Sequence, residues 1–275
     1  MKIANYLIKP FFSILVISSF SLVINAQEIS AVIEDIIVTA EKRTESLQDL
    51  SQAVTVLTSD DLDKKQISTF VDISAIAPGV NVAKNEGFKT VITIRGVGYE
   101  TNQNAIATPS VSYHLDGIYI ASPYSLQTEF MDLERIEVLR GPQGTLFGQN
   151  STGGAINVIT SAPSLEESSS YGDITIGDYS LIKTRASFNR PLSETLAVRA
   201  SFITHKRDGF TDNLSTGQDL DDADSISARV RFLYQPSETF RANFTAQIFD
   251  ENRNGSAQKG LLDTTTDPRK LRQNS

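Results

Sequence analysis

The chain has 275 residues, and its 33 acidic and 25 basic residues give a net charge of -8. An acidic balance of this kind argues against a nucleic-acid partner. The sequence contains no cysteine, which excludes disulfides, thiolate metal sites and thiol catalysis.

Residues 1–26 have the order of a secretory signal peptide. Lys2 and Lys9 provide the positive charge, an apolar stretch runs from Phe11 to Ile24, and the small residue Ala26 precedes Gln27. The apolar stretch is too short for a comfortable membrane span of about 20 residues. We therefore predict an exported protein cleaved after Ala26.

The next segment, residues 27–43, contains a run of strong strand formers from Ile36 to Thr39. No turn and no neighbouring run supplies a partner for it. The sequence thus predicts a strand that is unpaired within its own chain.

The text from Leu57 to Val80 predicts a helix. Thr58 or Ser59 can cap its first turn, and the Pro78-Gly79 pair ends the pattern. A short strand is expected from Val91 to Gly98, followed by a polar surface loop, Tyr99 to Thr108.

Ser110 to Ala121 reads as a hairpin around Asp116-Gly117, because both residues accept positive φ. A second polar loop, Ser122 to Glu129, leads to two strand-like runs between Leu133 and Thr160 with a glycine-rich connection. That connection lacks the lysine of a phosphate-binding loop, so its glycines are interpreted as sterically required. The first 160 residues therefore predict an α+β domain.

After Ser164 apolar and polar residues alternate in five segments of roughly the 9 to 11 residues that a tilted strand needs to cross a bilayer. The apolar face consists of even-numbered residues: Ile174, Ile176, Ile182, Ala186, Phe188, Leu196, Val198, Phe202, Val230, Phe232, Phe240, Phe244 and Ile248. The polar face consists of odd-numbered residues: Asp173, Lys183, Arg185, Arg199, Ser201, Arg229, Arg231, Arg241, Asn243 and Gln247.

The connections between these segments alternate between tight turns, Pro191 to Thr195 and Pro236 to Thr239, and a long acidic loop, Asp208 to Asp224. This asymmetry is typical of outer-membrane barrels and favours a barrel over a soluble β-sandwich, which shares the alternation.

The two histidines, His114 and His205, are far apart in sequence and have no metal-ligand spacing. No Ser/His/Asp constellation accompanies them. We predict no catalytic residue, no metal site, no enzymatic activity and no covalently bound cofactor.

Taken together, these features resemble the N-terminal part of a TonB-dependent outer-membrane receptor. The resemblance is carried by Asp35 to Ala40, Ile94 to Gly98, Asp116 to Ile120 and, above all, Arg135 to Thr160. It implies four parts: a signal peptide (1–26), a TonB-box segment (27–43), an α+β plug domain (44–163) and the first strands of an antiparallel transmembrane β-barrel (164–275). It also implies the cell outer membrane of a Gram-negative bacterium.

The resemblance assigns roles to individual residues. The TonB-binding strand would be Asp35, Ile36, Ile37, Val38, Thr39 and Ala40. Arg95 and Arg140 would lock the plug against glutamates of the barrel, and those glutamates are expected in strands beyond this sequence. The plug loops would bind ligand through Tyr99, Asn102, Gln103, Tyr124 and Gln127.

The expected function is uptake of a bulky nutrient, foremost a ferric siderophore, powered by TonB with the ExbB-ExbD inner-membrane complex. Heme, cobalamin, oligosaccharides and aromatic compounds are left open as ligands, and a passive porin or adhesin is the alternative class. Because such receptors close about 22 strands, we expect the sequence to be a fragment, which leaves two strand edges that lipid does not tolerate.

Overall fold

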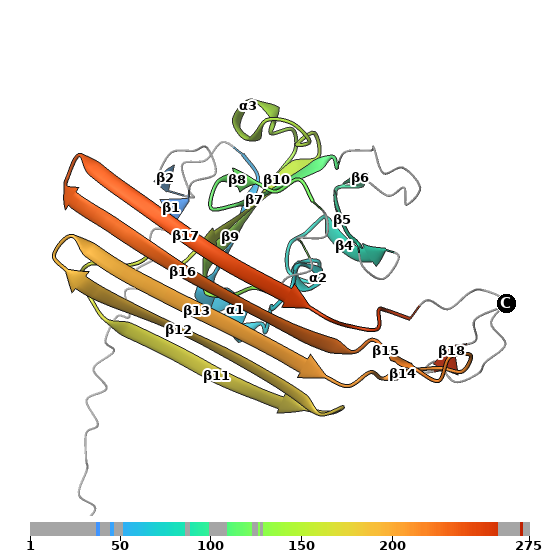
Figure 1. The fold of residues 1–275 in the computed structure, drawn as a ribbon. Helices are drawn as coiled ribbons and strands as arrows, with labels where there is room; N and C mark the ends of the chain where they lie inside the picture. The colour runs from blue at the N-terminus through green and yellow to red at the C-terminus, as the bar shows by residue number, and fades with distance from the viewer. Residues whose placement is uncertain are drawn as a thin grey trace, which may run out of the picture. The chain divides into compact units, whose positions relative to one another are not determined.

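The computed structural model describes residues 37–38, 45–46, 52–85, 89–98, 109–122, 126, 129–257 and 270–271, all within one compact unit (Figure 1). Its first part contains a five-stranded mixed sheet in the order β3-β9-β10-β7-β8 and a three-stranded sheet in the order β4-β5-β6. The mixed sheet comprises β3 (Val54–Thr58), β7 (Val111–Leu115), β8 (Ile118–Tyr119), β9 (Leu133–Arg140) and β10 (Gly154–Thr160). The other elements of this part are α1 (Ser59–Lys64), α2 (Phe70–Ile73), α3 (Gly144–Phe147), β4 (Val80–Asn85), β5 (Lys89–Ile94) and β6 (Val97–Gly98).

The helix predicted from Leu57 to Val80 is wrong in its extent, because the segment folds into strand β3 and the two short helices α1 and α2. Each helix starts with its own capping box: Thr58 with Asp61, and Thr69 with Asp72. Between them Gln66 has φ 54°, a left-handed conformation that a helix cannot continue through. Local caps and one backbone reversal therefore override the helical pattern.

The hairpin predicted at Asp116-Gly117 is confirmed, with β7 and β8 joined by two residues at φ 49° and 79°. Asp116 also accepts hydrogen bonds from the backbone N–H and the hydroxyl of Thr160, at 2.8 and 2.7 Å. The hairpin turn is thereby fixed to the end of β10.

The glycine-rich connection brings backbones close together at Gly153 and Gly154. A Cβ on Gly153 would lie 2.9 Å from the carbonyl oxygen of Val97, and one on Gly154 would lie 2.4 Å from that of Leu139. At these two positions a side chain has no room, which supports the steric interpretation.

The main core of this part packs the two helices against the mixed sheet. Phe70 of α2 is at its centre, with its ring 5.0 Å from Tyr113 and 4.8 Å from Phe130. Ile136 and Val138 of β9 are completely buried in the same cluster. The main core therefore lies on one face of the mixed sheet, and Leu139, Phe147 and Ala155 form a second, smaller buried cluster.

The second part is a five-stranded antiparallel sheet, here called the meander sheet, in the order β11-β12-β13-β16-β17 (Figure 1). Its strands are β11 (Ser169–Gly177), β12 (Leu181–Ser193), β13 (Leu196–Arg207), β16 (Ala223–Ser237) and β17 (Phe240–Glu251). All five predicted strands are present, although four of them are 12 to 15 residues long and so exceed the expected length. The predicted tight turns join β12 to β13 and β16 to β17.

In a soluble protein the apolar face of a sheet is buried and the polar face is exposed. The meander sheet has the opposite arrangement. The predicted apolar face is the open one: Ile176 is 78% exposed, Ile174 69%, Ile248 67% and Phe244 63%. Polar groups of the other face, such as Arg229 and Ser201, are buried. A sandwich would bury the apolar side, so the arrangement fits strands whose outer face meets lipid.

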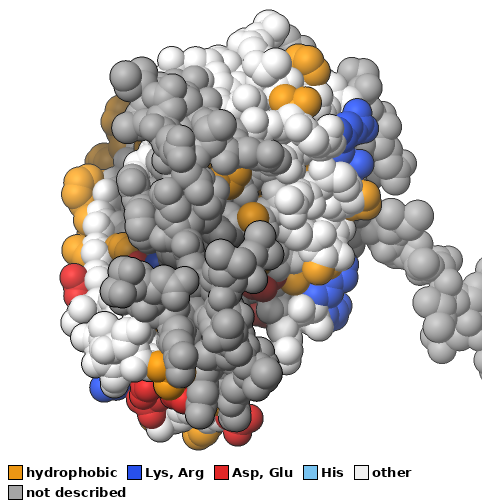
Figure 2. Space-filling view, turned by 90° about the vertical axis from the view of Figure 1, so that its right-hand side faces the viewer, with side chains coloured by type: hydrophobic (Ala, Val, Ile, Leu, Met, Phe, Trp, Pro, Cys, Tyr) orange, Lys and Arg blue, Asp and Glu red, His pale blue; other side chains and the backbone are white. Residues whose placement is uncertain are grey.

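The long connection from β13 to β16 forms a small hairpin of β14 (Thr211–Asn213) and β15 (Asp219–Leu220). Strand β14 also pairs in parallel with β18 (Lys270–Leu271). Figure 2 looks onto the side of Figure 1 where this hairpin lies and shows acidic side chains gathered there; Asp208, Asp212, Asp219 and Asp224 are exposed. In the part of the chain that the structure describes, no helix is long and apolar enough to span a membrane.

The predicted absence of a partner for the strand near residue 37 is wrong. Strand β1 (Ile37–Val38) pairs antiparallel with β2 (Glu45–Ser46), with Ile37 opposite Ser46 and Val38 opposite Glu45. Glu45 and Ser46 lack strand propensity, and the pairing therefore rests on main-chain hydrogen bonds that the residue pattern does not announce.

Candidate functional site

Most of the residues predicted to touch a partner or ligand lie outside the described residues: Asp35, Ile36, Thr39, Ala40, Tyr99, Asn102, Gln103, Tyr124 and Gln127. Of the TonB-binding strand, Ile37 and Val38 are described as β1. The roles of all these residues stay predictions.

Both predicted lock arginines are described. Arg95 is exposed and occupies the turn between β5 and β6 at φ 53°, with its N–H bonded to the carbonyl oxygen of Gly79 at 2.7 Å. Arg140 ends β9 and donates a hydrogen bond to the hydroxyl of Thr55. Its Nε is buried and has no acceptor among the described residues.

The two arginines follow residues that meet at one point. Leu139 and Ile94, which directly precede Arg140 and Arg95, both lie against Gly154. Close packing at this glycine therefore brings the two chain segments that carry the arginines together.

A second polar site, which the sequence reasoning missed, joins the first part of the chain to the meander sheet. Its acids come from the first part and its bases from the polar face of the sheet. We call it the polar seam, and it comprises Asp63, Asp116, Glu129, Asp132, Thr160, Lys183, Arg185, Arg199, Ser201, His205, Arg229 and Arg231.

One enclosed ion pair of the seam is that of Asp132 with Arg199. The guanidinium donates Nε and Nη2 to the two carboxylate oxygens at 2.7 and 2.6 Å, and the Ser201 hydroxyl donates to the same carboxylate. The Asp132 and Arg199 side chains are only 10% and 17% exposed. Two-pronged geometry and enclosure make this the strongest type of charge contact.

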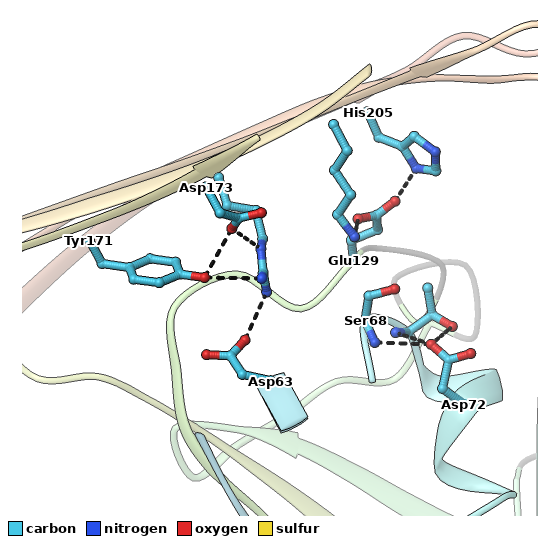
Figure 3. A network of polar contacts seen from close by, with 10 residues as sticks. Asp63, Ser68, Asp72, Glu129, Tyr171, Asp173 and His205 are labelled. Atoms are coloured by element: carbon cyan, nitrogen blue, oxygen red, sulfur yellow. Dashed lines mark hydrogen bonds and ion pairs between the residues drawn. The ribbon is translucent and has the colours of Figure 1, made fainter. Parts of the chain in front are cut away.

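Glu129 lies between two bases of neighbouring strands (Figure 3). The ammonium of Lys183 on β12 is 2.5 Å from its Oε2, and Nδ1 of His205 on β13 hydrogen-bonds to its Oε1. All three side chains are mostly buried. The Glu129 carboxylate thus contacts both β12 and β13.

Arg185 forms a looser contact with Asp63 of helix α1, which Figure 3 labels. It donates to Asp173 on the adjacent strand at 2.6 Å and to Asp63 at 3.3 Å. Asp63 is 51% exposed, so water weakens this pair. A cavity of about 320 Å³ borders the contact and is lined in part by Asp63, Tyr171 and Arg185.

The seam continues on β16 through two arginines that bind backbone oxygens. Arg231 donates to the carbonyl oxygens of Thr160 and Ser161 at 3.0 and 3.1 Å, and Arg229 donates to that of Met131 at 3.2 Å. The polar face predicted from the odd-numbered residues therefore contacts the first part of the chain along β12, β13 and β16.

Two carboxylates of the seam, those of Asp132 and Glu129, are stabilised in their charged form. Burial by itself would raise the pKa of Asp132, but the hydrogen bonds from Arg199 and Ser201 lower it overall. Burial by itself would also raise the pKa of Glu129, but the contacts with His205 and Lys183 outweigh the effect of burial and lower this pKa overall. Both acids remain ionised throughout the ordinary pH range.

The polar seam has its acidic and basic residues on the opposite sides from those of the predicted lock. The expectation placed arginines on the plug and acids on the barrel, whereas in the seam the acids precede residue 164 and the bases follow it. A usable signal was present, since the polar face carries Lys183, Arg185, Arg199, Arg229 and Arg231 with Asp173 as its one acid among the predicted face residues. Within the described ranges, no group of three or more His, Cys, Asp or Glu residues could hold a metal ion.

Comparison with known proteins agrees with this architecture. Residues 46–155 match the family model of the TonB-dependent Receptor Plug Domain. The pesticin receptor of Yersinia pestis is 31% identical over 204 residues, which cover 71% of this chain and 29% of that protein. The vitamin B12 transporter BtuB of Vibrio vulnificus is 25% identical over 254 residues, covering 89% of this chain and 37% of that one. The chain thus spans about a third of the length of these relatives.

Solved structures show the same fold at lower identity. The ferric yersiniabactin uptake receptor FyuA from Yersinia pestis superimposes with a TM-score of 0.63 at 24% identity, over 71% of this chain and 31% of that one. The outer-membrane ferripyoverdine receptor of Pseudomonas aeruginosa gives a TM-score of 0.67 at 17% identity, over 83% and 30%. The chain belongs to the TonB-dependent outer-membrane receptors of Gram-negative bacteria, and it combines their plug domain with the start of their antiparallel strands.

Proposed function

We propose that the protein takes up a bulky extracellular nutrient across the outer membrane, most readily an iron–siderophore complex, with energy delivered by TonB and the ExbB-ExbD complex. The transport involves no covalent chemistry on the ligand. The observation that carries the proposal is the meander sheet, whose apolar face is open while its basic polar face is closed by a folded domain.

This arrangement favours a gated receptor over a passive porin. A porin lumen is filled with water, and its inward-facing charges stay hydrated. Here Arg199, Arg229 and Arg231 are instead bonded to groups of the plug. A passage along this face therefore requires that contacts of the polar seam or of the plug itself rearrange, which calls for an energy source.

The TonB contact is proposed at residues 35–40. Strand addition takes its affinity from main-chain hydrogen bonds, and the run from Ile36 to Thr39 has the strand propensity for it. Because β1 already pairs with β2 over two residues, the incoming TonB strand would add to β1 or replace β2.

The relatives guide the choice of ligand. FyuA is described as a ferric yersiniabactin receptor, and PirA of Pseudomonas aeruginosa, 27% identical over 261 residues, as a ferric enterobactin receptor. BtuB makes vitamin B12 the second candidate. The ligand loops around residues 99–108 and 122–129, the lock at Arg95 and Arg140, and the domain limits 27–43, 44–163 and 164–275 are part of the same proposal.

The test is uptake of radiolabelled ferric yersiniabactin, ferric enterobactin and vitamin B12 by cells with the chromosomal gene intact, deleted, or carrying Val38→Pro. Proline removes the N–H that a paired strand donates, so Val38→Pro should abolish uptake at an unchanged surface level of protein. Val38→Thr keeps the amide and the β-branch and should retain uptake. Full uptake with Val38→Pro, or in cells without TonB, would establish a passive channel.

A further inference from the structure

We propose that Asn189 is a positioning residue that anchors the connection between the plug and the barrel wall, which is the meander sheet. The carboxyl end of the plug thereby stays in place while TonB pulls on the other end. The proposal rests on the proposed function, because it assigns the pull to TonB. The connection comprises residues 161–168, between β10 and β11.

Hydrogen bonds hold the connection more than packing does. The structure describes all eight of its residues; Pro163 alone is buried, and Glu166, Glu167 and Ser168 are exposed. Eight residues in extended geometry span about 27 Å. Without bonds to the wall, the connection would therefore allow the carboxyl end of the plug to shift by many ångströms.

Asn189 binds the connection directly. It stands on β12 opposite Ser169, the first residue of β11, and is 3% exposed. Its amide group donates to the carbonyl oxygens of Ser164 and Glu167 at 3.1 and 2.6 Å. Its Oδ1 accepts from the N–H of Ser164 at 2.9 Å. One enclosed side chain thus binds three backbone groups of the connection.

These three contacts require an amide side chain. The backbone presents one donor and two acceptors, and asparagine offers the matching acceptor and two donors. Aspartate has the same size but no donor, and it would place a negative charge against two carbonyl oxygens. Asn189→Asp should therefore release the connection with the volume of the side chain unchanged.

The plug side of the connection is bound to the wall as well. Arg231 on β16 donates to the carbonyl oxygens of Thr160 and Ser161. The N–H of Ser161 donates to the carbonyl oxygen of Asp132 at 3.0 Å. Arg231 and Asn189 therefore fix the end of the plug and its connection at two points, one on β16 and one on β12.

A fixed far end matters because the pull enters the plug at its amino-terminal side. A force deforms a folded domain only against a point that resists it, and a slack connection would let the plug follow the pull as a whole. Loss of the Asn189 anchor should therefore lower the yield of each energised cycle. The affinity for ligand should stay the same, because the substitution changes only how the connection is held.

The first measurement needs no ligand. The receptor expressed from its own gene is digested with a protease that cleaves after glutamate, and mass spectrometry follows cleavage after Glu167. Such a protease must bind the carbonyl group of Glu167, which is the group that Asn189 holds. Because two donated hydrogen bonds of ordinary strength are lost, Asn189→Asp should accelerate this cleavage about 30-fold.

Asn243→Asp is the matched control, because Asn243 lies on the same polar face of the sheet but is exposed. It should leave cleavage after Glu167 unchanged. Asn189→Ala removes the same bonds without placing a charge in the interior, and it is used where Asn189→Asp lowers the surface level of the receptor. Equal cleavage in the wild type and the Asn189 variant would overturn the proposal, whatever transport shows.

The second measurement is transport of the compound that wild-type cells take up. The Asn189 variant should lower the maximal rate per surface receptor several-fold at unchanged KM, as expected when binding is intact and a later step is impaired. A raised KM at unchanged maximal rate, or unchanged uptake, would refute the role of the anchor in the energised step. If wild-type cells take up none of the three compounds, the proposed ligands fail, and cleavage after Glu167 still decides whether Asn189 anchors the connection.

Discussion

Replacing Asp132 with asparagine removes the counter-ion of Arg199 and leaves its guanidinium mostly enclosed. Loss of one member of a buried ion pair costs about 3–5 kcal/mol. Because Arg199 keeps 17% exposure and can partly rehydrate, the lower end applies, about 3 kcal/mol. Since 1.4 kcal/mol corresponds to a factor of ten, the population with the plug detached from the wall should rise about 100-fold.

The assay uses a buried reporter on the wall. Ala197 lies on the odd-numbered face of β13 and is completely buried, so a maleimide can label Ala197→Cys only when this region opens. Adding Asp132→Asn should accelerate labelling about 100-fold, whereas Asp63→Asn, which breaks a half-exposed pair worth 0.2 to about 1 kcal/mol, should change it at most about fivefold. Equal effects of the two substitutions would show that burial of the ion pair does not govern plug seating.

Three further predictions use the same protein. Because the pKa values of Glu129 and Asp132 are lowered, their contribution to seating is complete at neutral pH and is lost as the pH falls below their ordinary values of 4.5 and 3.8. Maleimide reacts with the thiolate, so the labelling rate of Ala197→Cys is divided at each pH by that of the exposed reference Thr239→Cys. This ratio should be constant between pH 7 and about 5 and rise only in stronger acid. Acceleration already near pH 6 would contradict this. Gly154 has φ 152°, and Gly154→Ala would place a Cβ 2.4 Å from the carbonyl oxygen of Leu139. Overpacking of this kind costs about 1–3 kcal/mol and should lower the midpoint of denaturation measured by circular dichroism. An unchanged midpoint would mean that the two backbones separate freely. Phe244→Arg on the apolar face should lower the amount of membrane-inserted protein, because an arginine near the bilayer centre costs about 2–4 kcal/mol. Asn243→Arg on the polar face should leave that amount unchanged. Equal insertion of the two variants would argue against a lipid-facing surface.

The features that the sequence predicted correctly are those set by neighbours along the chain. Period two alone identified the five strands and the side on which Ile176 and Phe244 are exposed. Asp116-Gly117 marked a hairpin because only residues tolerant of positive φ fit its turn. In contrast, the helical pattern from Leu57 to Val80 did not show the left-handed residue Gln66 at which the predicted single helix is interrupted between α1 and α2.

The polar seam could not be read from the sequence because its partners are far apart along the chain. Asp132 and Arg199 are separated by 67 positions, and Asp63 and Arg185 by 122. The alternation placed the bases on one face, but it could not say that acids of the plug would meet them there. The resemblance implied a lock of opposite polarity, with arginines on the plug, and so did not point to Glu129 and Asp132.

Strand β9 connects the polar seam at Asp132 to the predicted lock at Arg140. Its pairing therefore decides how a force applied at residues 35–40 would reach these two sites. Asp132 directly precedes β9 at the seam, and Arg140 ends it at the predicted lock, about 26 Å away for eight residues in extended geometry. Among the strands that the structure describes, the edge strand β3, which leads back toward residues 35–40, pairs only with β9, with Val54 opposite Leu139 and Thr58 opposite Arg135. Force applied by TonB at residues 35–40 would therefore act first on the β1–β2 pairing and next on the β3–β9 pairing. If the β3–β9 pairing holds, the force passes into β9 and so to both Asp132 and Arg140. If it opens, the force passes along the chain to α1 and the Asp63–Arg185 contact.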